Sequence, residues 1–178
     1  GYFKDEKATK GALDSKSWLH TGDVGHIDED GFLFITDRKK DIIITAGGEN
    51  IAPQMIEGKI NQIQILGHSV VVGDKKKFLA ALVTLNPETL DHHLKTLGIE
   101  PKDDVDEYAK DPKLIKFIEE EIERVNQGLA RVQTVKKFLI LAKPFDVSTG
   151  ELTPTMKLKR KFILMKFAKE VEELYKVQ

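Results

Sequence analysis

The chain has 178 residues, 40 % of them hydrophobic and 32 % charged, which is enough to bury a core in one domain, or in one domain and part of another. Its 28 Lys and Arg residues balance 29 Asp and Glu residues, so the net charge of -1 provides no global field for nucleic acid or an anionic membrane. The absence of cysteine excludes thiol nucleophiles, disulfides and thiolate metal sites, and it suits a reducing compartment.

The apolar runs and the first residues bear on the cellular location of the protein. No apolar run approaches the roughly 20 residues of a transmembrane helix, and residues 1–5 lack the basic start and apolar middle of a signal peptide. We therefore expect a cytoplasmic protein, with peripheral membrane association left open. Because the sequence opens in mid-pattern without a methionine, we also expect it to be a fragment of a longer polypeptide.

The first part of the chain predicts a hairpin followed by a joint. A short polar helix is expected over residues 5–13, and a β-hairpin over residues 17–37, with Asp30-Gly31 in its turn. The charged run at residues 37–41 cannot continue a buried strand, which makes it a joint between two pieces of structure. Residues 1–40 are too few for a core of their own, so we assign them to the end of a larger preceding domain.

Strands and helices alternate from residue 41 onward. The apolar pattern predicts strands at 42–45, 69–73, 78–85 and 135–141. It predicts helices between and after them, at 53–62, 87–98, about 115–129 and 162–175. We interpret the three lysines at 75–77 as a solvated turn and residues 99–111 as a polar connection. The pattern predicts an α+β domain over residues 41–178, in which helices cover a small sheet.

Residues 42–53 combine a β-branched run, a glycine pair and a helix start. Gly47 and Gly48 allow positive φ and the close approach of another molecule, and Pro53 suits the first turn of a helix. A strand–turn–helix corner without any chemistry explains the same pattern. Both interpretations stay open on local pattern alone.

Four cations fall within residues 157–161, next to a Thr/Pro-rich loop. A solvated basic helix start is the simplest interpretation. Because the helix dipole disfavours cations at an N-terminus, an anion such as phosphate is the functional alternative.

Asp23 follows Thr21 and Gly22 in a loop. A carboxylate there can accept hydrogen bonds from both hydroxyls of a ribose, although an Asp in a loop is more often only a turn former. The five histidines show no metal-ligand spacing, so no metal site is predicted in this chain.

Four motifs in this order resemble the adenylate-forming enzymes, which include acyl-CoA synthetases, firefly luciferase and peptide-synthetase adenylation domains. The resemblance covers essentially the whole chain, and the ending LTPTMKLKRK with the helical insertion at about 87–130 is most similar to the long-chain fatty acyl-CoA synthetases, including the bubblegum-type branch. The motifs are TGD at 21–23, DRKKD at 37–41, ITAGGENI at 44–51 and LTPTMKLKR at 152–160.

The resemblance implies an ATP-dependent fatty acid–CoA ligase that acts in two steps. A carboxylate attacks the α-phosphate of MgATP, and the thiol of coenzyme A then displaces AMP to give the thioester. It also implies a large N-terminal domain in the same polypeptide, which would hold most of the ATP and acyl sites, and a mobile C-terminal domain over residues 41–178. The fragment alone is then expected to be inactive, with no nucleic acid partner.

Residue roles carry over from the same motifs. Lys157 would be the catalytic lysine of adenylation, Asp23 would bind the ribose and Arg38 would assist it. Lys40 would be the hinge, and Gly48, with Gly47, would line the tunnel for the pantetheine arm of CoA.

Three positions depart from the common family pattern: His20, Asp37 and Met156, of which the last two stand where many relatives have glycine. The competing hypothesis is a non-catalytic binding module whose basic patch at residues 157–161 contacts an anionic membrane or nucleic acid.

Overall fold

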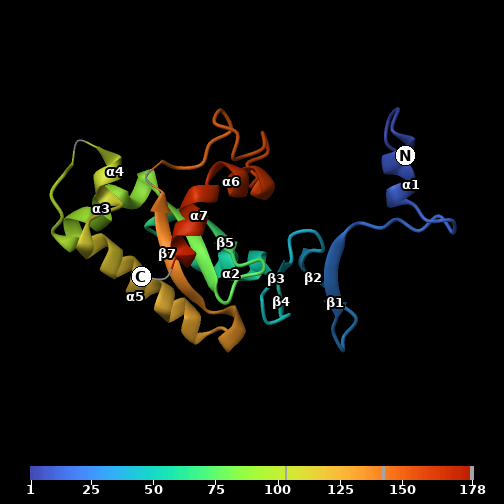
Figure 1. Cartoon of the computed structure of the whole chain (residues 1–178), viewed down its shortest axis with the longest axis horizontal. Helices are drawn as coiled ribbons and strands as arrows, with labels where there is room; N and C mark the ends of the chain where they lie inside the picture. The colour runs from blue at the N-terminus through green and yellow to red at the C-terminus, as the bar shows by residue number, and fades with distance from the viewer. Residues whose placement is uncertain (103, 142, 177–178) are drawn as a thin grey trace. The chain divides into compact units, whose positions relative to one another are not determined.

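The computed structural model describes residues 1–102, 104–141 and 143–176 (Figure 1). Contacts divide the chain into two units, Gly1–Ile42 and Ile43–Gln178. In the part of the chain that is described, no helix has both the length and the hydrophobicity needed to cross a bilayer.

The first unit contains one short helix and the expected hairpin. Helix α1 (Glu6–Ala12) is capped by the side chain of Asp5, and β1 (Asp23–Ile27) pairs antiparallel with β2 (Leu33–Arg38). The Asp28 carboxylate accepts hydrogen bonds from the backbone N–H groups of Asp30 and Phe32. This closes the turn that the Asp-Gly signal predicts, and Gly31 adopts a φ of 87°.

The second unit is built on a three-stranded sheet in the order β5-β6-β7. The tight turn between β5 (Leu66–Val72) and β6 (Leu79–Leu85) makes this pair antiparallel. β7 (Val135–Leu141) runs parallel to β6, which requires the long helical crossover that separates the two strands in sequence. The predicted bounds of β7 are confirmed.

Both faces of the sheet are buried, which is why β5 and β6 read as continuous apolar runs. One face of the sheet packs against α2, α3 and α5, and its side chains include Val71, Ala81 and Val83. The other face packs against α6 and α7, and its side chains include Val70, Val72 and Leu82. Figure 1 shows α5 on one side of the sheet and α6 and α7 on the other. The α+β class with a small, helix-covered sheet is therefore confirmed.

The helices of the second unit follow the apolar spacing of the sequence, with two differences. Residues 99–111 were expected to be irregular, but they contain α4, whose four residues are capped by the side chain of Asp104. The expected helix at 162–175 is divided in two at Phe167, which leaves the helical region with a ψ of 29°, although Ile163 and Leu174 still share the buried side. The helices are α2 (Pro53–Ile60), α3 (Pro87–Leu97), α4 (Val105–Tyr108), α5 (Pro112–Gln127), the 3₁₀ turn Arg131–Gln133, α6 (Arg160–Lys166) and α7 (Ala168–Tyr175).

A second, two-stranded hairpin carries the glycine pair. β3 (Ile43–Ile44) pairs with β4 (Asn50–Ile51), so Gly47 and Gly48 lie at the tip that joins them. The sequence predicts β3 from the β-branched run at residues 42–45, but not β4, because Asn50 and Ile51 lie in no such run.

Candidate functional site

Lys157 lies in a tight loop that projects from the second unit. Leu152 and Leu158 form an antiparallel bridge at its base. Inside the bridge, the Thr153 N–H donates to the Lys157 carbonyl at 2.8 Å, and the Lys157 N–H donates to the Thr153 hydroxyl at 3.0 Å. The backbone of Lys157 is thus fixed, while its side chain is exposed and makes no ion pair or hydrogen bond within the described residues.

Met156 closes the same loop in the left-handed region, with a φ of 61°, and its side chain is exposed. This conformation costs an ordinary residue roughly 1–2 kcal/mol, which explains why a glycine would suit the position. Met156 thus adopts a backbone conformation that favours glycine.

The N-terminal end of the loop is held by the buried carboxylate of Glu151, which is 2 % exposed. It pairs with the ammonium of Lys166 on α6 and accepts a hydrogen bond from the Thr149 hydroxyl. Burial alone would raise the pKa of the Glu151 carboxyl, but these hydrogen bonds outweigh it and hold the pKa below its ordinary value of 4.5. The ionised form is thus the one that the fold stabilises.

Because its pKa is lowered on folding, Glu151 contributes stability that is present above pH 4.5 and is lost as the pH falls through the folded value. We expect Glu151→Gln to lower the free energy of unfolding at neutral pH. The difference from wild type should shrink as the pH falls below 4.5, and urea unfolding across this range measures it. A difference that stays constant with pH would contradict the role of this carboxylate.

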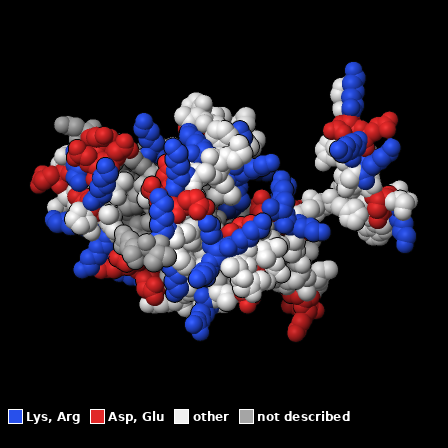
Figure 2. Space-filling view, in the orientation of Figure 1, with Lys and Arg blue, Asp and Glu red and all other residues white. Residues whose placement is uncertain are grey.

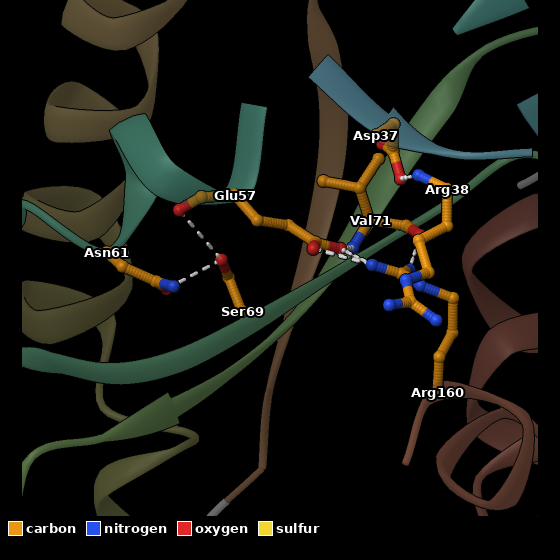
Figure 3. A network of polar contacts seen from close by, with 7 residues as sticks. All are labelled: Asp37, Arg38, Glu57, Asn61, Ser69, Val71 and Arg160. Atoms are coloured by element: carbon orange, nitrogen blue, oxygen red, sulfur yellow. Dashed lines mark hydrogen bonds and ion pairs between the residues drawn. The ribbon is translucent and has the colours of Figure 1, made fainter. Parts of the chain in front are cut away.

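The C-terminal end of the loop is held by a second ion pair, of which both members are largely buried (Figure 3). The Arg160 guanidinium donates to both carboxylate oxygens of Glu57 on α2, at 2.6 and 2.5 Å, and to the Val71 carbonyl at 3.1 Å. The Val71 N–H in turn donates to Glu57 at 2.6 Å. The side chains of Glu57 and Arg160 are 5 % and 13 % exposed, so the guanidinium joins α2, β5 and the start of α6 in the interior.

This ion pair corrects the interpretation of residues 157–161 as one solvated cationic patch. Arg160 is directed into the protein and is neutralised there, whereas Lys157, Lys159 and Lys161 are exposed. The cluster therefore combines a structural anchor with three surface cations. Neither member of the Glu57–Arg160 pair was identified from the sequence, and the only local signal is a carboxylate on the apolar side of α2.

The glycine hairpin places Gly47 and Gly48 at an exposed tip. Gly48 has a φ of 81° and its N–H donates to the Thr45 carbonyl at 2.9 Å, so the turn itself favours glycine. Apart from its two chain neighbours, no atom of the described residues lies within 4 Å of a Cβ added at Gly48. Crowding inside the chain therefore does not explain the glycine, and its role as tunnel wall stays a prediction.

Asp23 and Arg38 are brought together in the first unit. They are paired residues of β1 and β2, and the Arg38 Nε lies 3.1 Å from an Asp23 carboxylate oxygen. The side chains are 26 % and 52 % exposed, and the Asp23 N–H donates to the Thr21 hydroxyl. The predicted nucleotide residues thus form one partly exposed cluster.

Lys40 lies in a turn after β2, in which the Asp41 N–H donates to the Arg38 carbonyl at 2.9 Å. Its side chain is exposed, and the division between the two units falls two residues later, after Ile42. The hinge role of Lys40 and the domain boundary stay predictions. Within the described residues, no group of three or more His, Asp or Glu side chains is arranged to hold a metal ion.

The family of this chain follows from comparison with known sequences. The family described as "AMP-binding enzyme C-terminal domain" matches residues 40–178. The chain belongs to this family. The resemblance to adenylate-forming enzymes, drawn from four short motifs, is thereby confirmed.

The relatives of this AMP-binding enzyme C-terminal domain include long-chain-fatty-acid–CoA ligases. The ligase FadD15 of Mycobacterium tuberculosis is 43 % identical over 179 residues, which cover 98 % of this chain and 29 % of FadD15. Human ACSBG1, another long-chain-fatty-acid–CoA ligase, is 40 % identical over 195 residues, which cover 100 % of this chain and 27 % of ACSBG1. The chain thus spans less than a third of the length of these relatives.

Solved structures place the same fold in adenylating enzymes. The adenylation domain of a carboxylate reductase from Mycobacterium chelonae matches with a TM-score of 0.81 and 26 % identity, over 98 % of this chain and 26 % of that one. The o-succinylbenzoate CoA synthetase of Bacillus subtilis, in complex with its acyl-adenylate intermediate, matches with a TM-score of 0.62 and 25 % identity, over 91 % of this chain and 27 % of that one.

Proposed function

We propose that this chain is the C-terminal part of a long-chain-fatty-acid–CoA ligase that forms an acyl-adenylate from ATP and then a thioester with CoA. The observation that carries the proposal is an exposed lysine on a loop held at both ends by ion pairs with a buried carboxylate, in a chain 40 to 43 % identical to such ligases. The larger N-terminal part of the same polypeptide would hold most of the ATP, with its Mg²⁺, and the fatty acid.

In the first half-reaction, Lys157 would act by its charge. An ammonium that bridges the substrate carboxylate and the α-phosphate offsets their repulsion and stabilises the charge that develops in the transition state. The fixed loop backbone supports this role, because a cation that is positioned in advance needs no reorganisation during the reaction. Asp23 would accept hydrogen bonds from the ribose hydroxyls, with Arg38 beside it.

In the second half-reaction, the domain would turn about Lys40 and present the glycine hairpin in place of the lysine loop. The open space at Gly48 suits the passage of the narrow pantetheine arm. One domain would then supply a cation for adenylation and a side-chain-free wall for thioester formation.

A larger N-terminal part would also explain the apolar surface of the first unit. Phe32, Leu33 and Ile35, in and beside the β1–β2 hairpin, are 59 to 66 % exposed. An apolar face of this kind normally packs against further protein. We assign it to the part of the polypeptide that the longer relatives have and this chain does not contain.

The test of the proposed function is an activity assay of the longer polypeptide that contains this chain. With a long-chain fatty acid, ATP, Mg²⁺ and CoA, we expect formation of acyl-CoA, AMP and pyrophosphate, whereas residues 1–178 alone should give none. Pyrophosphate release without any fatty acid dependence, or no acyl-CoA with any chain length, would contradict the proposal.

Gly48→Leu tests the second half-reaction. We expect the longer ligase with this change to form acyl-adenylate normally but to transfer the acyl group to CoA roughly 10²-fold more slowly, because the side chain obstructs the thiol. Single-turnover assays of the two steps measure this difference. Gly98→Leu is the matched control, because Gly98 also has positive φ, at 61°, but lies at the end of α3. Equal slowing by both variants would attribute the effect to backbone strain alone.

A further inference from the structure

β7 is an edge strand of the three-stranded sheet, and a groove runs along its free edge. Within the described residues, β7 pairs with β6 on one side and with no strand on the other. A cavity of about 380 Å³ lies there, and its lining includes residues 135–140 of β7, one side of α5 and Leu174 of α7. Because an edge strand presents a row of unpaired backbone N–H and C=O groups, the groove can accept another strand.

The groove offers apolar surface in addition to backbone groups. Ile115 and Ile122 of α5 line it together with Phe138 and Ile140 of β7, and the side chains of Ile115 and Phe138 are only partly buried. A strand that entered the groove would remove this surface from water, which favours association. The charged residues at the rim then indicate the chemistry of the partner.

Lys136 and Glu119 are oppositely charged residues at the rim of the groove. Both side chains are exposed, and neither makes an ion pair or a hydrogen bond with the described residues. They lie on the same face of the sheet, because Phe138 and Ile140, which alternate with Lys136 along β7, pack in the core that α5 covers. The rim therefore carries one unpaired cation and one unpaired anion.

The two neighbouring charges have other contacts. The Lys137 ammonium lies 5.8 Å from the centre of the Phe78 ring, on the opposite face of the sheet, and the Glu123 carboxylate accepts a hydrogen bond from the Asn126 amide at 3.1 Å. Figure 2 shows basic and acidic side chains close together around α5 and β7, so neither sign dominates this surface. A surface of mixed sign suits a partner that carries both charges, as a second copy of the same chain does.

The sequence of β7 selects one register for pairing with a second copy. About a twofold axis through Phe138, all seven residues of the two antiparallel strands overlap, and Lys136 lies opposite Ile140 of the other copy. An axis through Lys137 would place the two Lys137 side chains opposite each other, which is destabilising. An axis through Leu139 would leave only five residues of each strand paired. Length and charge together therefore favour the axis through Phe138.

The same register brings Lys136 of one copy to Glu119 of the other. The Asn126 side chain exchanges two hydrogen bonds with the Val135 backbone, both at 2.9 Å, so the end of α5 lies beside the start of β7, and the two elements run in opposite directions (Figure 1). Glu119 precedes Asn126 by seven residues, or about 10 Å of helix, which corresponds to about three residues of strand. Glu119 therefore lies beside Phe138, within reach of the long Lys136 side chain of the other copy.

We propose that β7 pairs with β7 of a second copy of this chain, and that Lys136 of each copy forms an ion pair with Glu119 of the other. The three strands of each copy would then form one sheet of six. The contact is isologous, so it closes as a dimer and does not extend into a fibre. The inference goes beyond the proposed function and does not depend on it. The opposing explanation is that the edge lysines prevent strand pairing, which predicts a monomer.

Sedimentation velocity of this chain over a range of micromolar concentrations tests the inference. We expect the wild-type chain to dimerise, and Lys136→Glu and Glu119→Lys each to raise the dimer dissociation constant about tenfold, because each change places like charges at both symmetry-related contacts. The double variant Lys136→Glu/Glu119→Lys should recover the wild-type constant, because it rebuilds both pairs with the signs exchanged. Weakening by both single variants and recovery in the double variant together identify a direct pair.

The matched control is Lys95→Glu, which reverses the charge of an exposed lysine on α3 that does not line the groove. The control variant should dimerise like the wild-type chain, and circular dichroism checks that every variant keeps its fold. A wild-type chain that stays monomeric over the whole range would overturn the inference. A dimer that both single variants preserve, or a double variant that does not recover, would overturn it as well. Acyl-CoA formation by the longer polypeptide is a separate test of the proposed function.

Discussion

Replacing Lys157 by alanine in the longer ligase is expected to slow acyl-adenylate formation about 10²- to 10³-fold, the usual cost of removing one charge-stabilising group from a transition state. The fold should be unaffected, because the Lys157 side chain is exposed and the loop is held through its backbone. Fatty-acid-dependent pyrophosphate release without CoA measures the effect. Transfer from preformed acyl-adenylate to CoA should stay near the wild-type rate, because we propose that this step uses the glycine hairpin in place of Lys157.

Lys159 provides the matched control for Lys157. It lies two residues further along, is also exposed, and has its ammonium 5.0 Å from the centre of the Phe162 ring. Lys159→Ala should leave the adenylation rate nearly unchanged. If Lys159→Ala were slow and Lys157→Ala were not, the alignment of the motif, and with it the assignment of the catalytic lysine, would be wrong.

Breaking the Glu57–Arg160 pair is expected to have the largest effect on stability. Arg160→Met removes the guanidinium nitrogen that contacts both oxygens of the buried Glu57 carboxylate, and removing one partner of a buried ion pair typically costs roughly 3–5 kcal/mol. Since Arg160 follows the lysine loop by three residues, the variant of the longer ligase should also lose adenylation activity before it unfolds. Urea unfolding of the chain, followed by circular dichroism, measures the loss of stability.

Two further variants distinguish the loss of the Glu57–Arg160 ion pair from a general effect of removing a positive charge. Lys161→Met removes a neighbouring exposed cation and should change the free energy of unfolding by less than about 0.5 kcal/mol. The double variant Glu57→Gln/Arg160→Met should be more stable than Arg160→Met alone, because the buried group that has lost its Arg160 partner is then neutral. A double variant whose loss equals the sum of the two single losses would show that the residues act independently.

The sheet and its main helices were predictable because each depends on local pattern. β6 is a fully buried strand of seven residues, apolar except for Thr84, and β7 ends in the four apolar residues 138–141. α5 shows apolar residues at spacings of three and four, of which Ile118 and Ile122 are buried. Asp23 and Arg38 come from two separate family motifs and are paired in the structure, while their role at a nucleotide stays a prediction. Such features can be predicted from residues that are close in the sequence or from a family motif.

The contacts that position the site were not predictable in the same way. Glu57 and Arg160 are 103 residues apart, and nothing near either residue identifies the other as its partner. The docking of the Lys75–Lys77 turn on the hairpin depends on three backbone and side-chain contacts across about 30 residues. The break at Phe167 leaves the apolar spacing intact, so periodicity could locate the buried side of α6 and α7 but not the division between them.

The central claim is that one domain presents two catalytic faces in turn, the lysine loop and the glycine hairpin. The most direct test compares the two half-reactions in the longer ligase for Lys157→Ala and Gly48→Leu. We expect opposite patterns, in which the lysine variant is slow only in adenylation and the glycine variant only in transfer to CoA. If both variants slowed the same half-reaction and spared the other, the claim of two alternating faces would be contradicted.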